Sequence, residues 1–247
     1  MGCGMNVSKH ARRLVVAACI ALMCTALFLM GCAQASSGSS SASASSASAS
    51  ASSADVSVGK KAQAEGPYAT GTHHAELTVE GYDPITIELD ADAAPASVAN
   101  FCALAESGYY DGLTFYRFVK GFCMQGGTMG NTSSGHDSSL TPIVGEFSQN
   151  GYDNELADNF VKGTVAMARS SNPDGATSTF FVTLDSSEMV SLSLNGQYAA
   201  FGMIDDAGMA VVDQIVADYL PNVSDSASGV IGDESKQAKI ASIKVID

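Results

Sequence analysis

Short alternations of apolar and polar residues recur along the chain beyond residue 71. In one of them Ile85, Ile87 and Leu89 alternate with Thr86 and Glu88, which is the pattern of a strand with one buried face. Gly, Asn and Asp punctuate the intervals between such segments. Seven further segments fit short strands: residues 75–79, 113–119, 122–125, 164–168, 179–184, 200–204 and 240–246.

Two other segments have helical periodicity. One begins near Ala94 and ends at Gly108, with an apolar face of Val98, Phe101 and Ala105. The other ends before Pro221 and has an apolar face of Met209, Val212, Ile215 and Val216. Together these patterns predict a mainly β domain, a closed eight-stranded antiparallel barrel capped by two α-helices.

The first 31 residues have the layout of an export signal. Basic residues precede a largely apolar run over residues 14–30, and a small residue then stands before Cys32. This order matches the cleavage pattern of bacterial lipoproteins, in which the cysteine is acylated. We expect residues 1–31 to be a lipoprotein signal peptide and Cys32 to anchor the protein at the extracytoplasmic face of the cell membrane. An uncleaved anchor helix is the alternative, and it also leaves the domain outside the membrane.

A tract of low complexity follows the cysteine. Residues 33–54 are almost entirely Ser and Ala, a composition that cannot bury enough apolar surface to fold. We therefore expect residues 32–70 to form an acylated cysteine with a disordered tether, and residues 71–247 to form the folded domain.

Charge and composition exclude several classes of function. The net charge is −14, and it becomes −17 without residues 1–31, so nucleic acid partners are not expected. The six cysteines show no paired spacing, and no serine lies in a G-x-S-x-G motif. His73 and His74 lie next to Glu76 without a nearby cysteine or further histidine, so no metal is expected. Glycine patterns for nucleotides are missing from the sequence, so no cofactor is expected.

Residues 110–127 read YDGLTFYRFVKGFCMQGG and resemble the signature segment of the cyclophilins. Three further blocks, residues 163–169, 178–182 and 194–202, follow in the order and spacing that the family shows. The resemblance implies a cyclophilin-like barrel, peptidyl-prolyl cis/trans isomerase activity and a monomer. It also implies that the partners are proline-containing unfolded or exported polypeptides.

The reaction that the resemblance implies is rotation about an X-Pro peptide bond. No bond breaks, so a catalyst needs no nucleophile, base or metal and must instead bind the twisted amide better than the planar one. Arg117 matches the family's catalytic arginine, which donates a hydrogen bond to the prolyl nitrogen, and Gln125 matches the residue that orients it. The other positions that match substrate-binding residues are Phe122, Cys123, Ala168, Arg169, Thr179, Phe181, Leu194 and Tyr198.

Within this set we assign different roles to neighbouring residues. Phe122, Phe181 and Leu194 match the pocket for the proline ring, and Arg169 is expected to act through its main chain. Because adjacent strand residues point to opposite faces, Phe180 is assigned to the core together with Phe201.

Three positions depart from the family pattern and leave alternatives open. Thr179 replaces a usual glutamine, Ser193 stands where many members have tryptophan, and Tyr116 replaces a usual histidine. An active isomerase is the first hypothesis. The alternative is a tethered module that binds proline-containing peptides with weak or no turnover, and a surface adhesin that borrows the fold is a third.

Overall fold

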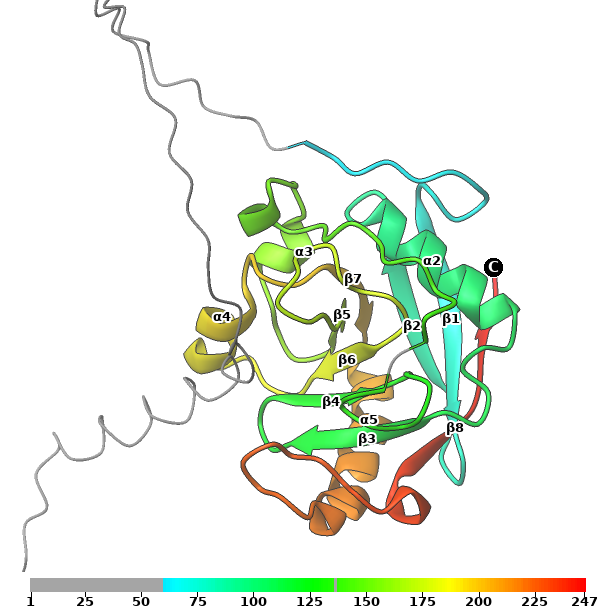
Figure 1. Ribbon diagram of the computed structural model, residues 1–247, viewed down its shortest axis with the longest axis vertical. Coiled ribbons are helices and arrows are strands. Elements are labelled where there is room, and N and C mark those ends of the chain that lie inside the picture. The colour runs from blue at the N-terminus through cyan, green and yellow to red at the C-terminus, as the bar shows by residue number, and fades with distance from the viewer. Residues whose placement is uncertain (1–59, 136) are drawn as a thin grey trace, which may run out of the picture. The chain divides into compact units, whose positions relative to one another are not determined.

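A computed structural model describes residues 60–135 and 137–247 of the chain. The predicted signal peptide, Cys32 and most of the predicted tether lie outside these residues. Eight antiparallel strands close into a barrel in the order β1-β2-β7-β5-β6-β4-β3-β8 (Figure 1), which confirms the predicted fold class. The strands are β1 (Thr72–Val79), β2 (Ile85–Asp90), β3 (Thr114–Val119), β4 (Cys123–Gly126), β5 (Thr164–Met167), β6 (Phe180–Thr183), β7 (Ala200–Ile204) and β8 (Ala238–Val245).

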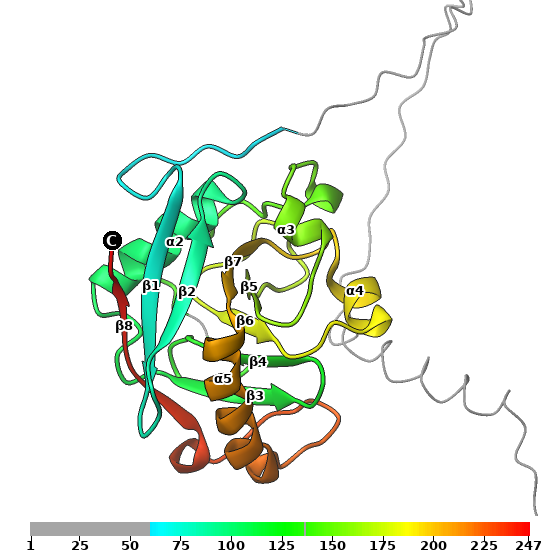
Figure 2. The ribbon, with the colours of Figure 1, turned by 180° about the vertical axis from the view of Figure 1, so that it is seen from behind.

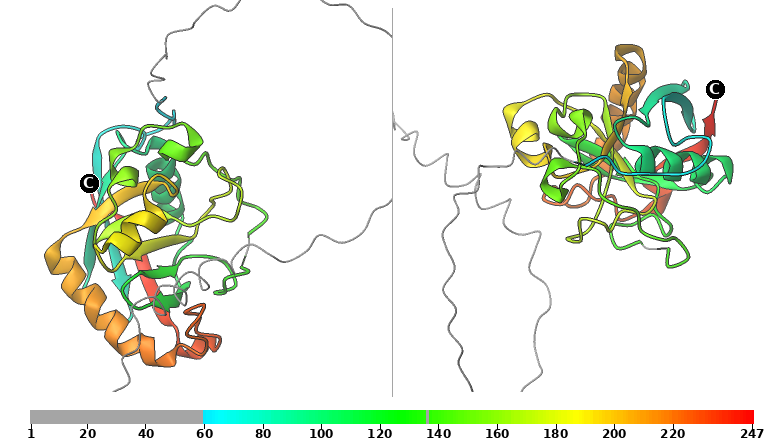
Figure 3. Two further views of the ribbon diagram at one scale, coloured as in Figure 1. Left: turned by 90° about the vertical axis from the view of Figure 1, so that its left-hand side faces the viewer. Right: turned by 90° about the horizontal axis from the view of Figure 1, so that it is seen from above.

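The two predicted helices are present as α2 (Pro95–Glu106) and α5 (Asp206–Tyr219). Helix α2 packs against β8, β7 and β2, whereas α5 packs against β2 and β7. Figure 2 shows α5 in front of the barrel, and Figure 3 shows that the two helices lie on separate sides. The pattern did not reveal α3 (Glu155–Asp158) and α4 (Glu188–Leu194), because such short helices carry too few turns for a detectable period. Three 3-10 turns complete the described elements: η2 (Ser148–Asn150), η3 (Leu220–Asn222) and η4 (Glu234–Lys236).

The alternating pattern places large side chains inside the barrel. Ile85, Ile87 and Leu89 have no exposed surface. Phe180 is also fully buried, and its ring meets Phe101 edge to face at a centroid distance of 5.4 Å. Phe201 and Phe180 therefore belong to the core as predicted.

Glu146 connects a distant loop to the start of α2. No side chain of the helix itself caps its N-terminus. The Glu146 carboxylate, 1% exposed, instead accepts hydrogen bonds from the backbone N–H groups of Ala96 and Ser97, both at 2.8 Å, and from the Ser97 hydroxyl. These bonds satisfy donors that the first turn of a helix leaves unpaired.

The part of the predicted tether that the structure describes, residues 60–70, contacts the domain. The backbone of Lys60 bonds to Gly151 and Asp153, and its ammonium lies 4.3 Å from the centre of the Tyr152 ring. The Tyr68 hydroxyl donates to Glu106. Across the described residues, no helix has the length and apolar character needed to cross a membrane.

We predict that Glu146→Gln lowers the unfolding free energy by about 1–3 kcal/mol at about pH 4, because glutamine has one acceptor oxygen where two oxygens of Glu146 accept from Ala96 and Ser97. Burial raises the pKa of Glu146 above its ordinary value of 4.5, against the lowering effect of its hydrogen bonds. Because the pKa of Glu146 is higher in the folded state, protonation of this side chain stabilises the fold. That stabilisation is fully present below the unfolded pKa and is lost as the pH rises through the folded pKa.

Urea unfolding of both proteins between about pH 4 and pH 7 measures this effect. The difference in unfolding free energy between wild type and Glu146→Gln should shrink as the pH rises. A difference that grows over this range would contradict the assignment.

Candidate active site

Strand register brings three of the predicted site residues into one row. Arg117 on β3 pairs with Gln125 on β4, and Gln125 pairs with Phe181 on β6. Directly paired residues of antiparallel strands point their side chains to the same face. Two strand spacings separate Arg117 from Phe181, which corresponds to roughly 10 Å. A cation, an amide and an aromatic ring therefore follow one another across the outer face of the barrel.

Three acceptors hold the guanidinium of Arg117. Its Nε donates to the carbonyl oxygen of Ser228 at 2.8 Å. Its Nη1 donates to Gln125 Oε1 at 2.9 Å and to Cys123 Sγ at 3.2 Å. A guanidinium has five N–H donors, and these contacts use three of them. Among the described residues no acceptor binds Nη2, so its two N–H groups remain for a ligand.

Cys123 contributes to the site as a neutral thiol. It lies beside Arg117 and is buried. Burial raises the pKa of Cys123 to about 11, although the adjacent guanidinium lowers it. Cys102 and Cys123 are both free. The thiol sulfur is therefore a hydrogen-bond acceptor for Arg117 and adds no negative charge near neutral pH.

Three of the predicted site residues are large apolar side chains, and one of them, Phe181, belongs to the row itself. The Phe181 ring is 4% exposed, meets Tyr198 edge to face at 5.6 Å and stacks on Phe160 at 6.1 Å. Leu194, 2% exposed, is buried at the C-terminal end of α4. Phe122 is half-buried at the turn between β3 and β4 and packs against the core. The sequence did not single out Phe160, because a buried phenylalanine resembles any core residue.

The side chain of Arg169 makes contacts of its own, whereas the sequence led us to expect a role for its main chain only. Its Nε and Nη2 donate to the carbonyl oxygen of Gln197 at 3.0 and 2.7 Å. Its guanidinium carbon lies 5.0 Å from the Phe147 ring centre and 4.9 Å from that of Tyr198. Arg169 therefore fixes both the backbone before Tyr198 and the ring itself.

The two remaining predicted residues border the row. Ala168 is half-buried, and its backbone N–H donates to the carbonyl oxygen of Thr179 at 2.8 Å. Thr179 precedes β6, and by alternation it faces the same side as Phe181. These contacts continue the β5–β6 pairing beyond the ends of both strands.

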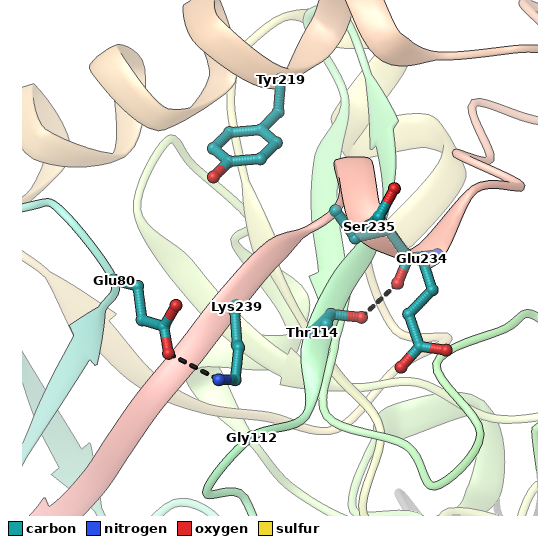
Figure 4. A pocket seen from close by; sticks show the side chains of 8 residues that line it. Glu80, Gly112, Thr114, Tyr219, Glu234, Ser235 and Lys239 are labelled. Carbon is teal, nitrogen blue, oxygen red and sulfur yellow. Dashed lines mark hydrogen bonds and ion pairs between the residues drawn. The ribbon is translucent and has the colours of Figure 1, made fainter.

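A separate hollow of about 590 Å³ opens between the β1–β2 turn, the start of β3 and the start of β8 (Figure 4). An ion pair of 2.7 Å between Lys239 and Glu80 crosses one side of it. Its described lining consists of Glu80, Gly112, Thr114, Tyr219, Glu234, Ser235, Gln237 and Lys239. None of these belongs to the row that contains Arg117.

Within residues 60–135 and 137–247, no three His, Cys, Asp or Glu side chains gather where they could hold a metal ion. His73 instead contacts the Asp247 carboxylate through Nδ1 and the Thr70 carbonyl oxygen through Nε2.

Comparisons with known proteins agree on one family. The family model described as "Cyclophilin type peptidyl-prolyl cis-trans isomerase/CLD" matches residues 74–245. A peptidyl-prolyl cis-trans isomerase of Acinetobacter baylyi is 37% identical over 163 residues, covering 65% of this chain and 79% of the relative. Peptidyl-prolyl cis-trans isomerase A of Dickeya dadantii is 36% identical over 159 residues, covering 63% and 77%.

Solved structures show the same likeness. A cyclophilin-type peptidyl-prolyl cis-trans isomerase of Cryptosporidium parvum superimposes with a TM-score of 0.56 at 26% identity, covering 70% of this chain and 99% of that one. That structure was solved in the presence of the dipeptide Ala-Pro.

Proposed function

This chain belongs to the cyclophilin-type peptidyl-prolyl cis-trans isomerase family, and we propose that Arg117 performs the isomerisation, on X-Pro bonds of exported proteins. The arrangement of the N–H donors of the Arg117 guanidinium supports this role. Ser228, Gln125 and Cys123 occupy three N–H groups, and no acceptor in the described part of the chain binds Nη2, which would donate to the substrate.

Arg117 lowers the rotational barrier by favouring the twisted amide. Amide resonance sets this barrier at about 18–20 kcal/mol. When the bond twists, the prolyl nitrogen loses its resonance and its lone pair becomes available as an acceptor. The planar substrate offers no such lone pair, so a hydrogen bond from Nη2 stabilises the transition state more than the ground state. A 10⁵-fold acceleration requires about 7 kcal/mol, which this bond shares with positioning of the substrate.

The apolar residues and Tyr198 position the substrate. Phe122, Phe181 and Leu194 receive the proline ring, so that the prolyl nitrogen faces the guanidinium. The Tyr198 hydroxyl donates to a substrate carbonyl, and Arg169 holds the Tyr198 ring for this purpose. Proline-containing peptides fit this arrangement, and the relative solved in the presence of Ala-Pro supports them as ligands.

We predict that Arg117→Ala lowers kcat/KM on an X-Pro tetrapeptide by about 100-fold or more, because one preorganised donor is worth that much in comparable sites. A protease-coupled isomerisation assay measures it. Arg117→Lys should recover little activity, since an ammonium cannot hold three anchors and present a further donor in a fixed direction.

Lys162→Ala is the matched control for loss of a cation. Lys162 forms an exposed ion pair with Asp213, and its removal should leave kcat/KM unchanged. Arg117→Ala with wild-type turnover would overturn the proposed mechanism. A wild-type protein that binds X-Pro peptides without turnover would instead identify the tethered binding module that Thr179 and Ser193 left open.

The export of the protein is part of the same proposal. The basic, apolar and small residues before Cys32 support a lipoprotein signal, and the Ser/Ala tract supports a tether. The enzyme would then act at the extracytoplasmic face of the membrane, on polypeptides that fold after export. Acylation supplies the attachment, since a surface of net negative charge is repelled by anionic lipids.

We predict that Cys32→Ala abolishes incorporation of a fatty-acid probe, because the acyl chain is attached to that cysteine. Metabolic labelling measures this incorporation. Cys24→Ala is the control and should keep the label, because residue 24 lies in the segment that cleavage removes. Label retained by Cys32→Ala, or membrane attachment without any label in wild type, would contradict the lipid anchor.

A further inference from the structure

A β-bulge lies beside the row that contains Arg117. Phe115 pairs with Gly126 and Arg117 pairs with Gln125, so Tyr116 is an additional residue on β3 without a partner of its own on β4. A bulge of this kind redirects a side chain. Without it, the alternation along β3 would point Tyr116 away from the face that carries Arg117.

The redirected side chain reaches Gln125. The Tyr116 hydroxyl accepts a hydrogen bond from Gln125 Nε2 at 2.8 Å, while Gln125 Oε1 accepts from Arg117 Nη1 at 2.9 Å. Tyr116 is 2% exposed, so water offers little replacement for this contact. Both ends of the Gln125 amide are therefore occupied, one by the arginine and one by the tyrosine.

Neighbouring segments hold the bulge in place. The backbone N–H of Ile231 donates to the Tyr116 carbonyl oxygen, and the N–H of Phe118 donates to the Gly229 carbonyl oxygen, both at 2.8 Å. Opposite the bulge, a Cβ on Gly126 would lie 2.3 Å from the Thr114 carbonyl oxygen, so only glycine fits there. The backbone from which the Tyr116 side chain projects is thus held by contacts on both sides of β3.

We propose that Tyr116 is a positioning residue for catalysis: its hydroxyl holds the Gln125 amide, and that amide aims the Arg117 guanidinium. This inference rests on the proposed function of Arg117. Without the hydroxyl, Gln125 Nε2 loses its partner and the amide turns away from Nη1. The guanidinium then keeps its Ser228 and Cys123 contacts but rotates more freely, and Nη2 meets the prolyl nitrogen less often.

Tyr116→Phe tests the proposal, since it removes one oxygen and keeps the ring. The expected result is a kcat about 3- to 10-fold lower with KM changed less than about twofold. The orientation of Nη2 matters for the hydrogen bond in the transition state and little for substrate binding. In a Gln125→Ala background, Tyr116→Phe should have no further effect, since the hydroxyl acts through that amide. An unchanged kcat, or an equal loss in both backgrounds, overturns the proposal.

Tyr110→Phe is the matched control for loss of a buried hydroxyl. Tyr110 has no exposed surface, and its hydroxyl donates to the Ser178 carbonyl oxygen at 3.1 Å. Tyr110→Phe should destabilise the fold about as much as Tyr116→Phe does and leave kcat unchanged. A general effect of destabilisation would instead lower kcat in both variants and overturn the assignment.

NMR of the Gln125 side-chain amide supplies a readout that needs no turnover. Tyr116→Phe should shift these resonances, and Tyr110→Phe should leave them in place. If wild type lacks turnover, the proposed function fails, and the amide resonances still decide whether Tyr116 holds Gln125. Unshifted resonances in Tyr116→Phe overturn the positioning role in either case.

Discussion

The proposed catalytic site depends on the hydrogen bonding of one side chain, the guanidinium of Arg117. An arginine in water presents all five N–H groups in no fixed direction. Here Ser228, Gln125 and Cys123 occupy Nε and Nη1, and Nη2 stays free of described protein acceptors. None of these acceptors is a carboxylate, so within residues 60–135 and 137–247 no ion pair neutralises the positive charge. A charge that is held but not cancelled is what a twisted prolyl amide requires.

The barrel makes this arrangement possible by bringing distant segments together. Register across β3, β4 and β6 aligns Arg117, Gln125 and Phe181, and the bulge adds Tyr116 to the same face. Ser228 arrives from the segment between α5 and β8, which lies along β3 in Figure 1. The side chains and the carbonyl oxygen that bind Arg117 therefore lie on a strand or on a segment that is hydrogen-bonded to one.

Much of the fold was predictable because one buried face imposes a period of two, as Ile85, Ile87 and Leu89 show. The short α4 was not predictable, since seven residues with Leu192 exposed carry no clear helical face. At the site, side-chain identities matched a known segment, and the resemblance implied that Gln125 orients Arg117, but the other partners could not be inferred. Ser228 acts through a carbonyl oxygen, which every residue has, and the contact of Tyr116 depends on a bulge that alternation alone does not predict. Arg169 likewise acts through packing on Phe147, a residue distant in sequence.

The most direct measurement is a crystal structure of the domain with a bound X-Pro peptide. We predict that the proline ring lies against Phe122, Phe181 and Leu194, with Arg117 Nη2 the nearest guanidinium nitrogen to the prolyl nitrogen, at about 3–3.5 Å. The contacts of Nε and Nη1 with Ser228 and Gln125 should remain as they are in the free protein. A proline ring bound in the hollow beside Thr114 and Lys239, or an Nη2 directed away from the peptide, would contradict the account.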